Sequence, residues 1–328
     1  MRSVVLRKAN FRSPETGTVF LRWFEEPIRG RKTYQVRWRN GAGRCPEYKE
    51  EFNFDTQAQC CQGHGRVGNN PQSTYHRGLR PLVGAGITAD LQVFTAHSVV
   101  GVSAVTALTV QSRTGVRRVE PVSAALLRET LDLLAEDGPI AGVKIGMLAT
   151  AELVEVVTKF LSRVRIPRER VVLDPVIWSS SGAELLSAEG VGRLREGLLP
   201  LVGWITPNVA EAGILAEIEV SGKEGVPELA GRLAKLGGGG LNVVVTGGNL
   251  EPPDDFLRTD SGEEIWVPGQ RVEARGVHGA HGTGCVFSSA LLCRLLVGDS
   301  KVEAVRGAKA WVVRRLEERQ GLHSSGLP

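Results

Sequence analysis

The sequence of 328 residues lacks any run of about 18 apolar residues, the length that a membrane-spanning helix needs. It has no apolar signal segment at its N-terminus, and its five cysteines are an odd number at irregular spacings. Such a set does not make a disulfide framework. We therefore expect a cytoplasmic protein with reduced thiols and no membrane span.

Charged residues are spread unevenly along the chain. The formal net charge is +4, and roughly the first eighty residues hold many arginines and lysines with few matching acids. Basic aromatic stretches at 20–24 and 34–39 have the composition of a nucleic-acid contact, but no recognised fold surrounds them. We expect a solvated or disordered segment here, and no nucleic-acid partner. Cys60, Cys61 and His64 lack a second ligand pair at zinc-finger spacing, so a structural or accidental cluster is expected.

From residue 84 onward, short apolar runs alternate with amphipathic stretches that begin at capping residues. This alternation is typical of βαβ units, and the chain is long enough for one large α/β domain, or a medium domain with an appendage. A mostly parallel sheet sandwiched by helices is the predicted architecture. We predict strands at 103–110, 142–147, 171–174, 203–206 and 242–246, and helices at 88–97, 124–136, 151–163, 188–198, 226–236, 283–296 and 302–318.

The strongest local motif is the glycine-rich sequence Gly279-Ala-His-Gly-Thr-Gly-Cys285, followed by an apolar helical run. Gly282, Thr283 and Gly284 can bring backbone N–H groups together at the positive end of that helix, which would form an anion hole for a transferring phosphoryl group. Cys285 lies in the first turn, where a thiol pKa tends to fall, and is a candidate base for a substrate hydroxyl. The structural alternative, a turn before a buried helix, carries similar weight.

Two carboxylates follow predicted strands. Asp174 ends the strand at 171–174, where an acid rarely serves packing, so we predict a metal or phosphate role. Asn208 and Glu211 have the spacing of a helix N-cap and its capping-box partner. Glu211 could equally help to organise Mg²⁺ through water.

Two further residues lie near the same predicted edge of the sheet, where ligands bind in such folds. Gln111 offers an amide that could read the edge of a heterocycle, which alone is weak evidence. Met147 could line a flat ring, although an ordinary core methionine explains it better.

Six segments occur together in one order, and jointly they resemble the hydroxymethylpyrimidine and phosphomethylpyrimidine kinases of thiamine biosynthesis, within the ribokinase-like superfamily. The resemblance covers 84 to about 318 and implies a three-layer α/β/α fold with a central, mostly parallel sheet. The segments are Gly84-Ala-Gly-Ile-Thr-Ala-Asp90, Thr106-Ala-Leu-Thr-Val-Gln111, Val143-Lys-Ile-Gly-Met-Leu148, Leu173-Asp-Pro-Val176, Ile205-Thr-Pro-Asn-Val-Ala-Glu211 and His281-Gly-Thr-Gly-Cys285.

This resemblance implies ATP-dependent phosphorylation of 4-amino-5-hydroxymethyl-2-methylpyrimidine and then of its monophosphate. It also implies roles for residues. The pyrimidine would be bound by Gln111, Met147, Ala85, Gly86 and Asp90; ATP by Asn208, Thr246 and Gly248; and Mg²⁺ by Asp174 and Glu211. Cys285 would replace the aspartate base of sugar-kinase relatives. A pyridoxal kinase-like B6 vitamer kinase and a degenerate, non-catalytic pyrimidine-binding domain are the alternatives, and relatives are commonly homodimers.

The chain departs from the family pattern in three places. Thr246 stands where many members have a lysine, which removes a positive charge from the phosphate site. Ser98 stands where a glycine usually ends a helix, and would bear the cost of a left-handed backbone if that geometry is kept.

The third departure is the loss of the family's first strand and loop, Thr-Ile-Ala-Gly-x-Asp-Pro-Ser-(Gly/Ser)-Gly-Ala-Gly, of which only the final Gly-Ala-Gly remains. Read one base later, the codons of 75–83 permit Thr-Ile-Ala-Gly-Phe-Asp-Pro-Ser-Ser. We infer a one-base slip near Gly84 and expect the chain as written to fold poorly or catalyse weakly. The expected organisation is an atypical, out-of-frame or disordered segment at 1–83, a ribokinase-like kinase domain at 84–320 and a tail at 321–328.

Overall fold

The computed structural model describes residues 10–13, 17–20, 85–112, 115–179, 181–220, 222–272 and 282–324. The chain divides into two compact units, Met1–Tyr75 and His76–Pro328. In the first, β1 (Asn10–Ser13) pairs with β2 (Gly17–Phe20) as an antiparallel ladder. The zinc alternative at 60–64, the basic stretch 34–39 and the segment 75–83 all lie outside the described residues.

A six-stranded sheet forms the centre of the second unit, with the order β10-β9-β8-β7-β6-β5. Four neighbouring strands are parallel: β5 (Val143–Ile145), β6 (Val171–Leu173), β7 (Trp204–Ile205) and β8 (Asn242–Val245). Two antiparallel strands, β9 (Asp255–Arg258) and β10 (Glu264–Val267), complete one edge. The predicted central, mostly parallel sheet is confirmed, whereas β9 and β10 were not predicted.

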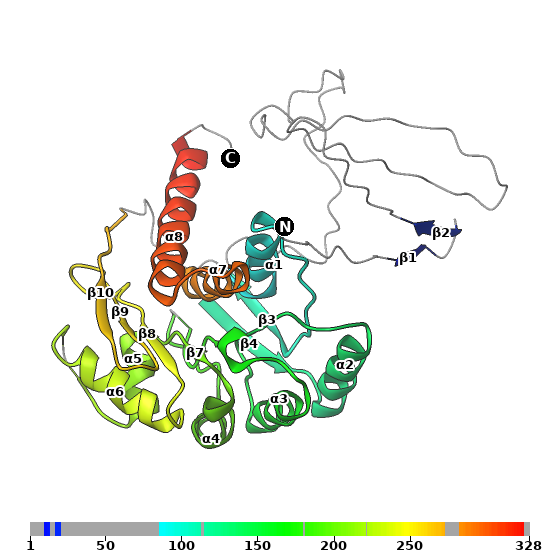
Figure 1. The fold of residues 1–328 in the computed structure, drawn as a ribbon, viewed down its shortest axis with the longest axis horizontal. Helices are drawn as coiled ribbons and strands as arrows, with labels where there is room; N and C mark the ends of the chain where they lie inside the picture. The colour runs from blue at the N-terminus through cyan, green and yellow to red at the C-terminus, as the bar shows by residue number, and fades with distance from the viewer. Residues whose placement is uncertain are drawn as a thin grey trace, which may run out of the picture. The chain divides into compact units, whose positions relative to one another are not determined.

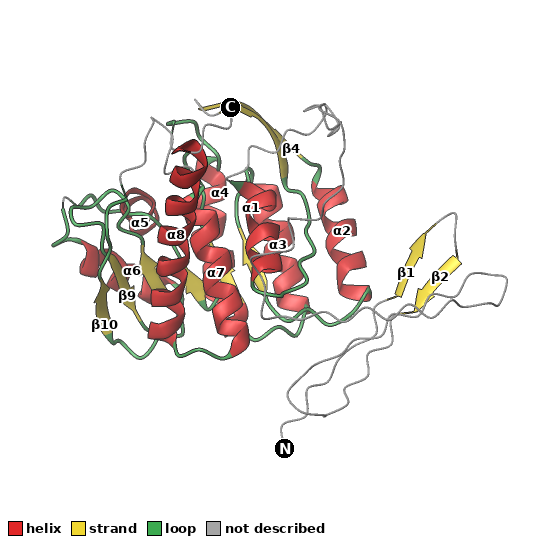
Figure 2. Ribbon diagram, turned by 90° about the horizontal axis from the view of Figure 1, so that it is seen from above, coloured by secondary structure: helices red, strands yellow, loops and turns green. Residues whose placement is uncertain are grey.

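Side chains alternate between the two faces of this sheet, and each face is covered by helices. Val172, Trp204 and Val244 pack toward α1 (Gly86–Ala96), α7 (Thr283–Val297) and α8 (Lys301–Ser324). The opposite face packs against α2 (Ala124–Glu136), α3 (Ala151–Arg163), α4 (Ala188–Arg193), α5 (Val209–Ala216) and α6 (Val226–Leu236). Figure 1 shows these layers, and α7 lies between α1 and α8 (Figure 2). The three-layer α/β/α fold is therefore confirmed.

Capping residues set the starts of several helices where the sequence predicts them. Ser123 accepts a hydrogen bond from the Leu126 N–H, and Thr150 accepts one from the Leu153 N–H. Both following helices have their predicted bounds. After α4 the chain continues as a π turn (Leu194–Leu198) and a 3₁₀ turn (Leu199–Leu201), and another 3₁₀ turn (Arg168–Arg170) precedes β6.

The ends of α1 and α8 bear on two further expectations. Ser98, just past α1, has a φ of 58°, so the left-handed geometry expected there is kept without glycine. The last helix, α8, continues to Ser324, six residues past its predicted end and into the predicted tail at 321–328. None of the described helices is long and apolar enough to cross a membrane.

The predicted strand at 103–110 is confirmed only in its second half, 107–110, and its expected place in the main sheet is wrong. Residues 101–106 are irregular, and β3 (Ala107–Ser112) pairs with β4 (Gly115–Pro121) in a two-stranded hairpin outside the main sheet. Within the described part of the chain, β5 is the last strand of the main sheet, and 103–106 does not pair with it. Leu108 is 63% exposed and Val110 is 51% exposed, so apolar residues that suggested a buried strand face outward.

Candidate active site

Three loops that follow parallel strands meet at one edge of the sheet, where ligands bind in folds of this kind. Asp174 follows β6, Asn208 follows β7, and Thr246 follows β8. The Asp174 N–H donates to the Ile145 carbonyl at 2.8 Å, and the Thr246 N–H donates to the Pro207 carbonyl at 2.8 Å. An isolated parallel β-bridge also pairs Asn208 with Thr246. The structure thus brings together residues predicted to serve metal and nucleotide.

The start of α7 lies against the same edge. Gly282 is the N-cap, with a φ of 84° that favours glycine. A Cβ added to Gly284 would lie 3.9 Å from both carboxylate oxygens of Asp174, and Ser288 Oγ donates to Asp174 Oδ2 at 3.1 Å. The predicted helix start at Thr283 is confirmed, and its first turn faces Asp174; His281 lies outside the described residues.

Lys144 is a site residue that sequence reasoning missed. Its Nζ lies 3.1 Å from Asp90 Oδ2 and 3.7 Å from Asp174 Oδ2, and its side chain is 4% exposed. Ser289 Oγ donates to Asp90 Oδ1 at 2.8 Å, so α1, β5, β6 and α7 are tied together here. The available signal was a lysine inside an apolar strand, because lysine is almost never buried without a partner.

Charge compensation keeps this buried lysine ionised. Burial alone would lower the pKa of Lys144, but Cys285, when ionised, and the carboxylates of Asp90 and Asp174 together raise it above its ordinary value. Burial raises the pKa of Asp174, and the Lys144 ammonium opposes that effect. The cluster is therefore a compact set of opposite charges directly beside the N-terminus of α7.

Cys285 lies in the first turn of α7 as predicted, but its expected low pKa is wrong. Burial raises the pKa of the thiol to about 11, with further increases from Asp174 and Asp90. The Lys144 ammonium and the backbone N–H of Gly86 act in the opposite direction without prevailing. At neutral pH the group is therefore a thiol, hydrogen-bonded to Asp174.

Asn208 and Glu211 form a complete capping box, so the structural interpretation of their spacing is confirmed. Asn208 Oδ1 accepts from the Glu211 N–H at 3.0 Å, and Glu211 Oε2 accepts from the Asn208 N–H at 3.0 Å. Glu211 Oε1 also accepts from the Ile177 N–H at 3.3 Å. Burial, and then the charge of Asp174, raise the pKa of Glu211 to about 8.

These two buried carboxyls have the chemistry to serve a divalent cation. Magnesium usually takes one or two carboxylates, with waters and substrate phosphates completing its shell. Among the described residues, no group of three or more His, Cys, Asp or Glu side chains could hold a metal ion. Asp174 and Glu211 therefore fit Mg²⁺ that arrives with a nucleotide, and do not form a protein-only metal site.

The residues predicted for the pyrimidine come from three segments. Gly86, with a φ of 66°, has open space where a Cβ would be. Half-buried Met147 follows β5, and its carbonyl accepts from Thr106 Oγ1 at 2.6 Å, which fixes the start of the hairpin beside it. Gln111 is half-buried on β3, next to a bulge between Val110 and Gln111. The structure thus places Gln111 on the hairpin, and not at the end of a strand of the main sheet.

On the nucleotide side, the Thr246–Gly248 turn is built from backbone contacts. Thr246 Oγ1 donates to the Pro207 carbonyl at 3.3 Å, and the Gly247 N–H donates to Asp255 Oδ1 at 2.9 Å. Gly248 is exposed.

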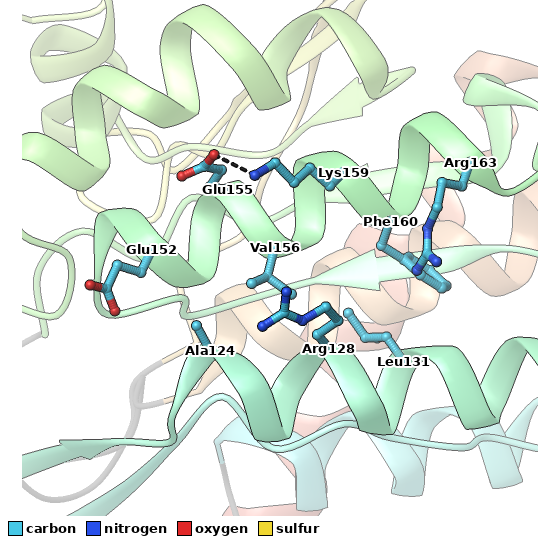
Figure 3. Close-up of a pocket in the computed structure, with 9 residues that line it drawn as sticks. All are labelled: Ala124, Arg128, Leu131, Glu152, Glu155, Val156, Lys159, Phe160 and Arg163. Atoms are coloured by element: carbon cyan, nitrogen blue, oxygen red, sulfur yellow. Dashed lines mark ion pairs between the residues drawn. The ribbon is translucent and has the colours of Figure 1, made fainter.

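The cavity drawn in Figure 3 is separate from this candidate site. It measures about 390 Å³ and lies between α2 and α3, over an apolar floor with a charged rim that includes the Glu155–Lys159 ion pair. None of the predicted site residues lines it.

Known proteins resemble this chain in sequence and fold. A family model described as phosphomethylpyrimidine kinase matches residues 81–327. The chain belongs to the phosphomethylpyrimidine kinase family. A hydroxymethylpyrimidine/phosphomethylpyrimidine kinase from Aquifex aeolicus is 36% identical over 241 residues, which cover 73% of this chain and 91% of the relative.

Solved structures of similar proteins agree with the family's fold. The crystal structure of phosphomethylpyrimidine kinase from Clostridium difficile has a TM-score of 0.61 at 29% identity, covering 71% of this chain and 94% of that one. An ADP complex of Bacillus subtilis pyridoxal kinase also has a TM-score of 0.61 at 29% identity, covering 71% and 86% respectively. The ribokinase-like fold is therefore shared by kinases for two different substrates.

Proposed function

We propose that this protein uses ATP to phosphorylate the hydroxymethyl group of 4-amino-5-hydroxymethyl-2-methylpyrimidine, and then its monophosphate, in thiamine diphosphate biosynthesis. The observation that carries this proposal is the start of α7, where Gly284 and Cys285 lie beside Asp174 at the carboxyl end of β6. Family membership and the name of the Aquifex relative support the same substrate.

Stabilisation of phosphoryl charge is the main task of such a site, since the transition state is loose and spreads charge over the equatorial oxygens. The N-terminus of α7 directs backbone N–H groups, including that of Gly284, toward the side on which such charge is stabilised. Bound Mg²⁺, held by Asp174 and Glu211, would neutralise phosphate charge. The Lys144 ammonium keeps the buried carboxylates compensated before nucleotide binds.

The substrate hydroxyl must lose a proton as the new P–O bond forms. We assign that proton to Cys285, whose own proton must first pass to solvent water, since the pKa of the thiol is about 11. Asp174 is the neighbouring carboxylate and accepts a hydrogen bond from the thiol. We further propose that Gln111, Met147, Ala85, Gly86 and Asp90 bind the pyrimidine, and that Asn208, Thr246 and Gly248 bind ATP.

Pyridoxal phosphorylation is the second candidate, because the Bacillus subtilis pyridoxal kinase has the same fold. A coupled ATP assay on the pyrimidine alcohol, its monophosphate and pyridoxal separates the two. We expect turnover of both pyrimidines and strong loss of turnover in Cys285→Ala. Turnover of pyridoxal alone would favour the second candidate, and binding of pyrimidine without turnover of ATP would indicate a degenerate domain.

For the rest of the chain, we propose that 84–320 carries the activity, that 1–83 is out of frame, and that the protein is a cytoplasmic homodimer. Two facts support the boundary: the family match begins at 81, and the compact units divide after Tyr75. The nucleotide sequence of codons 75–83 tests the frame directly. A shifted reading without Thr-Ile-Ala-Gly and Asp-Pro-Ser would contradict it.

A further inference from the structure

A buried ion pair lies behind the turn proposed to bind ATP. Lys309, on α8, places its Nζ 2.8 Å from Asp255 Oδ1 at the start of β9. The two side chains are 14% and 6% exposed. The site described above uses neither residue. A buried pair of charges contributes little net stability in most proteins, so its contacts are informative about its role.

Asp255 connects this pair to the turn. The oxygen that faces Lys309, Oδ1, also accepts the Gly247 N–H at 2.9 Å. Gly247 stands between the two residues proposed to contact nucleotide, Thr246 and Gly248. A Cβ at Gly247 would lie 1.8 Å from the Asp254 carbonyl oxygen, so the turn packs directly against the chain leading into β9.

Lys309 also makes a second contact, with the backbone of the segment that leads into β9. Its Nζ donates to the Pro253 carbonyl at 2.8 Å, two residues before Asp255. A Cβ at Gly269 would lie 1.9 Å from the same carbonyl oxygen and 2.8 Å from Lys309 Cε, so close packing surrounds the ammonium. The backbone two residues before Asp255 and the Asp255 carboxylate itself are therefore both fixed to α8.

Charge explains why a lysine is needed here. Burial raises the pKa of Asp255, and Lys309 is the first influence that lowers it. Without the ammonium, the carboxyl would tend to protonate, and a neutral acid is a weaker acceptor for the Gly247 N–H. The neighbouring Asp254 cannot replace Asp255 as the acceptor, because its carboxylate already contacts Lys223 at 2.6 Å and accepts the Gly269 N–H at 2.8 Å.

We infer that Asp255 and Lys309 are positioning residues for nucleotide binding, through which α8 fixes the Gly247 amide and so the Thr246–Gly248 turn. The inference rests on the proposed role of that turn in binding ATP. The position of the Gly247 amide matters because the Thr246–Gly248 turn has no charged side chain of its own.

Two measurements on the full chain test this inference without requiring turnover. Hydrogen–deuterium exchange reports on the Gly247 amide, and calorimetry with Mg·ADP reports on nucleotide affinity. In Lys309→Met we expect exchange in 244–250 to be at least about tenfold faster and ADP affinity about tenfold weaker, the effect of losing one charged hydrogen bond. Lys309→Arg, which keeps the charge, should remain close to the parent.

The matched control is Lys301→Met, on the same helix, which removes a more exposed pair with Asp260. It should change neither readout. Unchanged exchange and affinity in Lys309→Met would overturn the inference. Equal losses in Lys309→Met and Lys309→Arg, together with a lower melting temperature, would also overturn it, because they would show that the side chain acts through packing. A parent chain that fails to bind ADP also overturns it. A parent that binds ADP but phosphorylates no substrate contradicts the proposed activity alone.

Discussion

Lys144 Nζ lies 3.7 Å from Asp174 Oδ2, inside the sheet layer and 3.1 Å from a second carboxylate on α1. This contact joins the end of β6 to β5, the edge strand among the described residues, where the side chain is 4% exposed. The buried carboxylates beside α7 are therefore compensated by a cation from the fold itself, before any metal or nucleotide binds.

Replacement of Lys144 should be strongly destabilising. In Lys144→Met the carboxylates of Asp90 and Asp174 remain buried without their cation, which costs about 3–5 kcal/mol of unfolding free energy. Chemical denaturation measures this directly. Lys159→Met, which removes an exposed pair with Glu155, should cost less than about 1 kcal/mol. Equal costs in the two variants would show that the Lys144 contacts are not maintained.

Glu211 should make the ligand-free protein less stable as the pH rises. Its pKa in the folded protein is about 8, against 4.5 as the ordinary value, so the folded state holds a proton that the unfolded state has lost between those values. Unfolding free energy should then fall as the pH rises through this window and level off above about pH 8.

Glu211→Gln should remove this part of the pH dependence, since glutamine keeps the capping box and carries no charge. Denaturation at about pH 5 and about pH 9, without Mg²⁺, measures the difference. Glu228→Gln, on the exposed surface of α6, serves as the control. If the parent and Glu211→Gln lose the same stability over this range, the carboxyl is already ionised in the folded protein.

Cys285→Ala should lower kcat by about 10²–10⁴ if the thiol accepts the substrate proton, while Mg·ADP binding stays unchanged. The matched control is Cys293→Ala. This buried thiol lies two turns further along α7, away from the start of the helix that faces Asp174. Activity of Cys285→Ala equal to that of its parent would remove the thiol from the role of base.

Restoring the shifted reading of 75–83 should raise both the stability and the turnover of the protein. Replacement of residues 75–83 by Thr-Ile-Ala-Gly-Phe-Asp-Pro-Ser-Ser supplies a short apolar strand, and β5 is the edge of the described sheet that could receive it. We expect higher melting temperature and faster turnover than in the chain as written, and no gain from a scrambled insert of the same composition. Turnover of the chain as written at the level of intact relatives would contradict the frame hypothesis.

The sequence predicts best where local chemistry decides the structure. Ser123 and Thr150 cap helices whose bounds were predicted in full, because a hydroxyl before an amphipathic run satisfies the first free N–H groups. The positions of Asp174, Asn208 and Cys285 at one edge follow from the carboxyl ends of parallel strands and the start of α7. Local pattern is sufficient for these features.

What the sequence could not predict depends on tertiary partners. Residues 103–106 lead into β3 as one continuous run, but in the described structure they pair with no strand of the main sheet, and sequence alone does not show which partner a strand finds. The buried role of Lys144 depends on carboxylates 54 residues before it and 30 residues after it in the chain. The raised pKa of Cys285 likewise depends on burial, which outweighs the effect of the helix N-terminus.

The most direct test of the central claim is detection by mass spectrometry of the monophosphate formed from 4-amino-5-hydroxymethyl-2-methylpyrimidine and Mg·ATP, with the chain as written and with the restored strand. We predict an ATP-dependent monophosphate in both reactions, formed faster by the restored protein and nearly lost in its Cys285→Ala variant. Absence of the product from both proteins, under conditions where each is folded and binds ADP, would contradict the assignment as a pyrimidine kinase.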